Sequence, residues 1–268
     1  MTTNEQSNIL RRLVIRVGKG SLIFTTTDDQ AQVVMEPFPV NSSITMAANL
    51  REALRTSHIL SGQYQRTTVM VDSPVLMVPI DFFHEEEKTE LYFHAFTKKE
   101  QHAIMHTVLP DLNSVALFCI DKDLLAVIND RMCQPSIVAA MTPVWRHLYH
   151  RSYTGTHQKL YGYFHNQHME VFSYGINRFK FCNTYVVNNS SNALYYLLSV
   201  WKQLGLVPEH DELHLVGDLP DEEALLNEAR QFVKRVYYIN PSGEFNRAPV
   251  TQIAGMPYDL MTLYVKGR

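Results

Sequence analysis

The turn Gly18-Lys19-Gly20 has residue types that could bind a phosphate group. Glycine allows backbone N–H groups to approach phosphate oxygens, and a lysine ammonium can contact them as a point charge. Gly217-Asp218 ends a strand-like run and is a second candidate. The candidate ligand-binding residues are therefore Gly18, Lys19, Gly20, Gly217 and Asp218. The alternative is structural, because glycine also suits any tight turn after a strand.

Histidine and cysteine are present, but their spacing predicts neither a metal site nor a catalytic site. A zinc ion needs three or four converging ligands. Close pairs among the twelve histidines, such as His102 and His106, His147 and His150, and His165 and His168, supply two each. The three cysteines form no Cys-x-x-Cys motif, and their odd number favours a reduced compartment over a disulfide scaffold. No serine has the flanking glycines of a nucleophile elbow. We expect no metal and assign no catalytic residue.

One segment could bind single-stranded nucleic acid. It contains aromatic and basic residues, namely Trp145, Arg146, Tyr149, Arg151, Tyr153 and Lys159. Bases stack on aromatic rings while basic side chains follow the phosphate backbone. A linker helix that packs between two domains explains the same pattern, and we favour it. The net charge of −3 gives no general attraction to nucleic acid, which we do not expect as a partner.

The elements that carry these residues occur twice along the chain. In 10–40 and again in 159–187, three short strand-like runs are separated by polar turns. Each set is followed by an amphipathic helix, with Ser43 and Ser191 as the predicted N-caps. A repeat with such a long period indicates a duplicated structural unit.

Both units continue as strand, helix and strand, which predicts a parallel crossover. In the second unit the two strands are 213–216 and 236–239. In the first unit we match the strand 115–120 to 213–216, with Asp121 as the cap of the helix that follows. This match leaves an extra segment in the first unit, before residue 115.

A meander of three strands followed by helix, strand, helix and strand is the order of a ribonuclease H-like unit. Two such units in tandem predict an α/β protein with mixed sheets and an actin-like ATPase fold. We place the first unit in residues 1–153, with a small β-α-β insert at about 67–112, and the second unit in residues 154–268.

The second unit also contains the most distinctive sequence of the chain. Its runs are Phe181-Cys182-Asn183-Thr184-Tyr185, Ala193-Leu194-Tyr195-Tyr196-Leu197-Leu198, Gln203-Leu204-Gly205-Leu206 and Leu215-Val216-Gly217-Asp218. With them, nearly the whole chain resembles an uncharacterised family of Bacteroides-type bacterial proteins with an actin-like ATPase fold. More distantly, it is similar to the actin-like proteins of cell division and pilus assembly, which act as cytoplasmic adaptors that bind short segments of partner proteins.

The resemblance implies a phosphate loop in the first hairpin of each unit. The actin-like enzymes carry Asp-x-Gly there, and the aspartate orients metal-bound water. Here Arg16 stands at the aspartate position, and arginine can neither hold Mg²⁺ nor act as a base at neutral pH. The turn 164–168 has no aspartate or glycine, and the adenosine-side turn at Gly217 has one glycine instead of two. We expect no ATP hydrolysis and no cofactor; bound ATP with Mg²⁺ is the alternative.

The composition, with 46% hydrophobic and 19% charged residues, is that of a globular protein. The first residues are polar and lack the pattern of a signal peptide. No apolar stretch approaches the roughly 20 residues that span a bilayer. We expect a cytoplasmic protein without a membrane span.

Together these features predict a non-catalytic, actin-like scaffold or adaptor that binds another protein through its cleft, its insert or an exposed strand edge. The main alternative is a nucleotide-binding or small-ligand sensor, or a weak ATPase, that uses the cleft between the domains with Lys19, Gly217 and Asp218. A third interpretation, RNA binding through residues 145–153, is less favoured.

Overall fold

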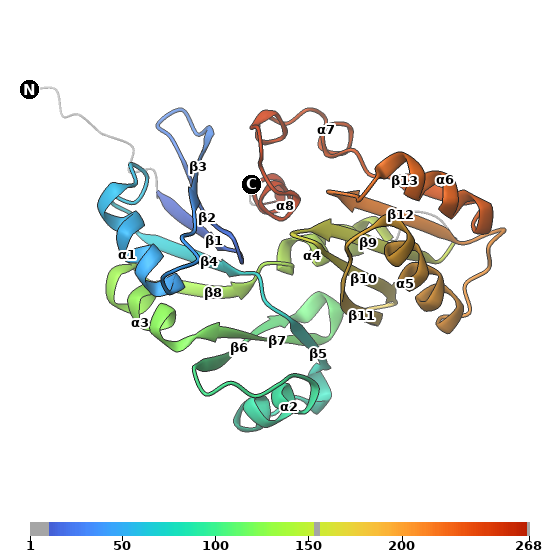
Figure 1. Cartoon of the computed structure of the whole chain (residues 1–268), viewed down its shortest axis with the longest axis horizontal. Helices are drawn as coiled ribbons and strands as arrows, with labels where there is room; N and C mark the ends of the chain where they lie inside the picture. The colour runs from blue at the N-terminus through green and yellow to red at the C-terminus, as the bar shows by residue number, and fades with distance from the viewer. Residues whose placement is uncertain (1–10, 153–155, 267–268) are drawn as a thin grey trace, which may run out of the picture. The chain divides into compact units, whose positions relative to one another are not determined.

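The computed structural model describes residues 11–152 and 156–266. Its strands form two five-stranded sheets and one three-stranded sheet (Figure 1). The contacts divide the chain into two compact units, neither of which is one continuous stretch. Unit 1 comprises Met1–Ser73, Lys99–Met105 and Cys119–Ala140, and unit 2 comprises Pro74–Lys98, His106–Phe118 and Met141–Arg268.

The first five-stranded sheet belongs to unit 1 and has the order β3-β2-β1-β4-β8. Its strands are β1 (Arg12–Val17), β2 (Ser21–Thr27), β3 (Val33–Pro39), β4 (Arg66–Val71) and β8 (Pro135–Ala139). The first three form an antiparallel meander, whereas β4 runs parallel to both β1 and β8. β1 is buried along nearly its whole length, as a central strand with both faces covered should be. The helices α1 (Met46–Thr56) and α3 (Lys122–Arg131) pack against each other beside this sheet (Figure 1).

The second five-stranded sheet belongs to unit 2 and has the order β11-β10-β9-β12-β13. Its strands are β9 (Lys159–His165), β10 (His168–Gly175), β11 (Arg178–Val186), β12 (Glu212–Gly217) and β13 (Arg235–Tyr238). Again three antiparallel strands are followed by two parallel ones. This repeated order confirms the predicted duplication and the mixed α/β class.

The two faces of the second sheet carry different side chains, because neighbouring residues of a strand point to opposite faces. One face is mainly aliphatic and packs on α5 (Ser190–Gln203) and α6 (Glu222–Phe232) around Trp201. This core explains why both helices have the apolar periodicity seen in the sequence.

The other face of the second sheet is rich in aromatic residues. The Tyr174 hydroxyl donates to the backbone oxygen of Trp145 at 2.8 Å. Trp145 belongs to α4 (Thr142–Ser152), which packs in turn against α8 (Tyr258–Lys266). Between them in sequence lie the short helices α7 (Pro241–Glu244) and η4 (Pro249–Gln252). Unit 2 therefore packs helices on both faces of its five-stranded sheet.

The insert is a three-stranded sheet of order β5-β7-β6. Its elements are β5 (Val75–Pro79), η1 (Ile80–Phe82), η2 (Glu85–Glu87), α2 (Lys88–Ala95), β6 (His102–Leu109), η3 (Pro110–Leu112) and β7 (Ser114–Asp121). β7 pairs antiparallel with β5, whereas the strand parallel to β1 is β4, with Arg66 opposite Arg12. The match between residues 115–120 and 213–216 is therefore wrong, and β4 is the strand that corresponds to β12.

The error has a physical cause. Asp121 ends β7 and caps α3 by accepting from the Asp123 N–H at 2.9 Å, just as a capped helix follows β12. The chain thus returns from the insert directly into α3. Since β4 lies in the first sheet, the extra segment begins after β4 instead of at about residue 67. The domain limits at residues 153 and 154 stay a prediction.

The two predicted N-caps also differ from the structure. α1 is capped by Thr45, whose hydroxyl accepts from the Ala48 N–H at 3.2 Å, because Ser43 lies in an earlier turn held by Asn41. α5 is capped by Asn189, since Ser191 already lies inside the helix.

Candidate functional site

The turn between β1 and β2 holds the three candidate residues of unit 1. The Gly18 N–H donates to the Ser21 oxygen at 3.0 Å, which closes the turn. Lys19 and Gly20 are exposed, and no described atom lies within 4 Å of where a side chain on Gly20 would begin. This turn is therefore open to solvent, and its role in ligand binding stays a prediction.

Arg16, at the end of β1, is buried and paired with an acidic residue. It is 2% exposed, and its Nη2 lies 3.4 Å from Oδ2 of Asp72, directly after β4. The Asp72 N–H donates to the Val17 oxygen at 2.9 Å, which fixes the carboxylate beside β1. A buried charge needs such a partner. An ion pair thus occupies the position that the resemblance assigns to the phosphate-loop aspartate.

The turn between β9 and β10 is a tight two-residue hairpin. Asn166 and Gln167 have φ angles of 47° and 61°, the conformation of a type I′ turn that suits the twist of antiparallel strands. Its sequence contains no glycine that would let a phosphate approach the backbone.

Gly217 and Asp218 lie against the end of β9 in unit 2. The Asp218 N–H donates to the Phe164 oxygen at 3.0 Å. Gly217 has a φ of +96°, and a Cβ on it would lie 2.1 Å from the same oxygen and 3.0 Å from the Tyr163 ring. The close approach of β12 to β9 therefore requires glycine here. The five candidates fall into two groups, three in unit 1 and two in unit 2.

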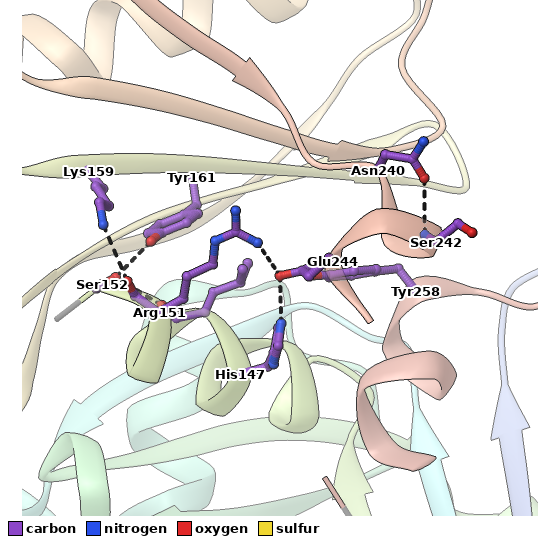
Figure 2. A network of polar contacts seen from close by, with 10 residues as sticks. His147, Arg151, Ser152, Lys159, Tyr161, Asn240, Ser242, Glu244 and Tyr258 are labelled. Carbon is purple, nitrogen blue, oxygen red and sulfur yellow. Dashed lines mark hydrogen bonds and ion pairs between the residues drawn. The ribbon is translucent and has the colours of Figure 1, made fainter. Parts of the chain in front are cut away.

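A second polar constellation in unit 2 surrounds Glu244 and joins three helices (Figure 2). Oε1 of Glu244 accepts from His147 Nε2 at 2.7 Å and from Arg151 Nη1 at 2.5 Å, both on α4. Oε2 accepts from the Tyr258 hydroxyl of α8 at 2.8 Å. The Glu244 side chain is 6% exposed. Asn240 opens α7 by accepting from the Ser242 N–H at 3.0 Å, which sets the position of Glu244.

The charge of Glu244 is stabilised in spite of its burial. Burial raises the pKa of a carboxyl, but the hydrogen bonds of His147 and Tyr258 and the charges of His147 and Arg151 outweigh it and lower the pKa of Glu244. Burial and the Glu244 charge raise the pKa of Tyr258 well above its ordinary value. A carboxylate with a low pKa and three donors is a weak base. The cluster therefore fastens α4, α7 and α8 and is not suited to acid–base catalysis.

The last turn of α4 makes further polar contacts with β9 (Figure 2). The Ser152 and Tyr161 hydroxyls lie 2.9 Å apart, and Lys159 Nζ donates to the Arg151 oxygen at 3.3 Å. Burial raises the pKa of Tyr161 to about 12 and lowers the pKa of Lys159. These groups hold the helix on the sheet.

Comparison with known proteins identifies the family. A family model described as a protein of unknown function (DUF3822) matches residues 2–236. The chain belongs to this family. A Bacteroides thetaiotaomicron protein, described as having an actin-like ATPase fold and unknown function, is 26% identical to this DUF3822 chain, with a TM-score of 0.85 over 98% of this chain and 99% of that one.

A chain of the PilM–PilN type IV pilus biogenesis complex is a more distant neighbour. It is 10% identical, with a TM-score of 0.56 over 96% of this chain and 98% of that one, which supports the fold alone. No curated protein matches the DUF3822 chain. The comparisons confirm the resemblance and the actin-like ATPase fold.

The described residues contain neither a cluster of metal ligands nor a membrane-spanning helix. Across 11–152 and 156–266, no three His, Cys, Asp or Glu side chains converge so that they could hold a metal. Within the same ranges, no helix combines the length and the apolar character needed to cross a bilayer. His102 and His106 lie on β6.

The segment considered for nucleic acid is mostly interior. Trp145, Tyr149 and Lys159 are buried, so they are not available to stack on bases or contact phosphates. Tyr153 lies outside the described residues. The contacts of α4 with α8 lie within unit 2, so the predicted role of this segment as a linker helix between two domains stays a prediction.

The sequence predictions missed Glu244 and Tyr258. A signal was present in α4, because His147 and Arg151 are four residues apart and share one helix face. Both side chains can donate hydrogen bonds, so together they could bind one anionic partner.

Proposed function

We propose that this DUF3822 protein is a non-catalytic, actin-like scaffold or adaptor that binds another protein. The observation that carries the proposal is the buried ion pair of Arg16 with Asp72 at the end of β1. Nucleotide hydrolysis in this fold needs a carboxylate that orients metal-bound water there, and arginine supplies none. The PilM–PilN complex gives an example of the same fold in a protein complex.

A direct test of the missing nucleotide chemistry is isothermal titration of the full chain with Mg-ATP. We expect no binding heat above dilution. Low-micromolar binding of Mg-ATP would contradict this expectation if it is lost in Lys19→Ala and kept in the matched surface variant Lys202→Ala on α5.

Strand β11 supports partner binding by strand addition. The other edge strands of the two five-stranded sheets are less suitable, because β3 contains two prolines, β8 begins with proline, and β13 has only four residues. β11 has nine residues and no proline. The Val187 N–H donates inward to the Gln167 oxygen, so the N–H of Val186 before it points outward.

The side chains at this end of β11 also suit an interface. Val186 is 59% exposed, and Tyr195 of α5 is 67% exposed. Tyr185 stacks on Tyr196 with ring centroids 4.5 Å apart, and Tyr195 meets Tyr196 edge to face at 5.5 Å. Tyrosine is enriched at the energetic centres of protein interfaces. Since β5 and η3 also contact β11, the proposed partner site is the exposed Val186 end.

Affinity capture with the tagged full chain tests this proposal. We expect a specific partner whose recovery falls in Val186→Pro, which removes an outward donor, and in Tyr195→Ala. Tyr237→Ala, an exposed tyrosine of β13, is the matched control and should retain the partner. Failure to recover any specific partner counts against the adaptor function.

A ligand sensor is a second candidate, favoured by the open space beside Gly20 and the exposure of Lys19. A ligand that binds only the native state raises the melting temperature. A nucleotide or metabolite that does so in the wild type and in Lys202→Ala, but not in Lys19→Ala, would support the sensor over the adaptor.

A further inference from the structure

A groove of about 770 Å³ lies beside α1 in unit 1. Its apolar lining comes from Ile44, Ala48 and Leu54, and its basic lining from Arg51, Arg55 and Arg131. Ile44 directly precedes the α1 cap, and Arg131 is the last residue of α3. The groove is thus lined by residues of both helices, which pack against each other beside the first sheet (Figure 1).

The helix geometry and a buried amide set the shape of the groove. Residues three and four apart share a helix face, which aligns Ala48 with Arg51 and Arg55. Ile44 is held beside this face by the buried side chain of Asn49. Asn49 Nδ2 donates to the backbone oxygens of Ile44 and Thr45 at 3.4 and 3.0 Å, and Asn49 Oδ1 accepts from the Asn41 N–H at 2.7 Å. The apolar end of the groove is therefore built into the fold.

The groove is basic in a chain whose net charge is −3. Of the described residues that line it, one is acidic, Glu52, and three are arginines. Arg131 Nε lies 2.8 Å from Asp130 Oδ2, so its charge is already partly matched. Among the described residues, the side chains of Arg51 and Arg55 form no ion pair or hydrogen bond. Two guanidinium groups one helical turn apart are therefore available to an external anion.

We infer that this groove binds an acidic peptide segment of a partner protein. Carboxylates of the peptide pair with Arg51 and Arg55, since the planar guanidinium matches a carboxylate with two parallel hydrogen bonds. An apolar side chain of the peptide packs against Ile44, Ala48 and Leu54. Within the described part of the chain, no aromatic residue lines the groove for base stacking, which favours a peptide over single-stranded nucleic acid. The inference rests on the proposed protein-binding function but uses a surface of unit 1, not the β11 edge.

Fluorescence anisotropy of the full chain with synthetic peptides tests the inference. The probes are fluorescein-labelled peptides of about twelve residues, in which one leucine is combined with two aspartates or glutamates at systematically varied spacings. Matched peptides carry asparagine or glutamine instead, and a further set replaces leucine with serine. We expect binding by acidic, leucine-containing peptides only, with an affinity that decreases as salt screens the ion pairs.

Substitutions of groove residues test where the peptide binds. The double variant Arg51→Ala with Arg55→Ala should lower the affinity for the tightest-binding peptide by about tenfold or more, as expected for the loss of charged hydrogen bonds. Ile44→Ser should lower the affinity for leucine-containing peptides toward that of their serine counterparts. The matched control is Lys202→Ala with Arg230→Ala, which removes two exposed positive charges from α5 and α6 in unit 2. Thermal melting of each variant checks that the fold is intact.

Three results would overturn the inference. They are equal binding of acidic and amide peptides, equal losses in the α1 variant and the charge-matched control, and tighter binding of a single-stranded oligonucleotide with the same dependence on Arg51 and Arg55. Val186→Pro separates this inference from the β11 proposal. If it abolishes partner capture while peptide binding persists, the strand edge and the groove are independent. If peptides fail while capture depends on Val186, only the groove inference is lost.

Discussion

A glycine at position 217 can be explained either by ligand binding or by close backbone packing, and the sequence alone does not distinguish the two. It was a candidate for the nucleoside side of a ligand site. In the structure its φ of +96° and its closeness to the Phe164 oxygen give glycine a steric reason to be there. This reason does not depend on any ligand.

We predict that Gly217→Ala destabilises the protein by about 2–4 kcal/mol, because the new methyl group adds a clash with Phe164 to the cost of a left-handed backbone. Gly205→Ala is the matched control. Its φ is +63°, but no described atom lies within 4 Å of the added Cβ, so it should cost only about 1 kcal/mol. Urea unfolding of both variants measures the difference, and equal losses would refute the steric explanation.

Glu244→Gln tests the cluster on α4, α7 and α8. At pH 7 the variant should lose about 2–3 kcal/mol of unfolding free energy, since it weakens charged hydrogen bonds in a buried site. The folded-state pKa of Glu244 lies below the ordinary value of 4.5. The stabilisation is therefore complete above pH 4.5 and is lost as the pH falls through the folded-state pKa.

The measurement is the urea midpoint of wild type and Glu244→Gln between pH 7 and pH 3. We expect the two stabilities to converge at low pH. A constant difference over this range would mean that the ionised carboxylate does not contribute. Asn227→Ala, on the exposed face of α6, serves as a control for general acid destabilisation.

The Glu244 cluster shows why part of the candidate site could not be predicted. Its carboxylate meets His147 and Arg151, which are 97 and 93 residues away in sequence. The turn Gly18-Lys19-Gly20 was predictable, because it follows from local residue types. Contacts over long separations depend on packing, and no local pattern in α7 marks Glu244 as buried.

At the scale of elements, the start of α1 gives a sharp test. Thr45→Ala should cost about 1 kcal/mol, because its hydroxyl accepts from the Ala48 N–H. Ser43→Ala, two residues earlier, should change the stability by no more than a few tenths of a kcal/mol, as expected for an exposed residue outside the helix. Thermal or urea unfolding distinguishes the two, and the opposite order would restore Ser43 as the cap.

The strands show a similar division between local and long-range information. The second sheet was predictable because its elements follow one another without interruption. In the first unit, β4 and β7 are both buried along most of their length, and β7 leads into the capped helix α3. Only the pairing of β4 with β1 shows which strand belongs to the five-stranded sheet.

At the scale of the molecule, the limit predicted at residues 153 and 154 can be tested with two fragments. α4 belongs to unit 2 and packs against α8, with Trp145 fully buried. We expect the fragment 141–268, which keeps α4, to melt more cooperatively and at a higher temperature than 154–268. Circular dichroism and hydrogen exchange measure both. Equal stability of the two fragments would instead support the limit at 153.

The position of β4 between β1 and β8 has a consequence for synthesis on the ribosome. β4 ends at Val71, but its second neighbour begins only at Pro135, after the insert and α3. At a rate of ~5–20 residues per second, this interval lasts roughly 3–13 s. During it the outer N–H and C=O groups of β4 lack their final partner, and such an edge is a template for pairing with other chains. The nascent first sheet is therefore most vulnerable to aggregation in this window, and slowing translation between Val71 and Pro135 lengthens its exposure.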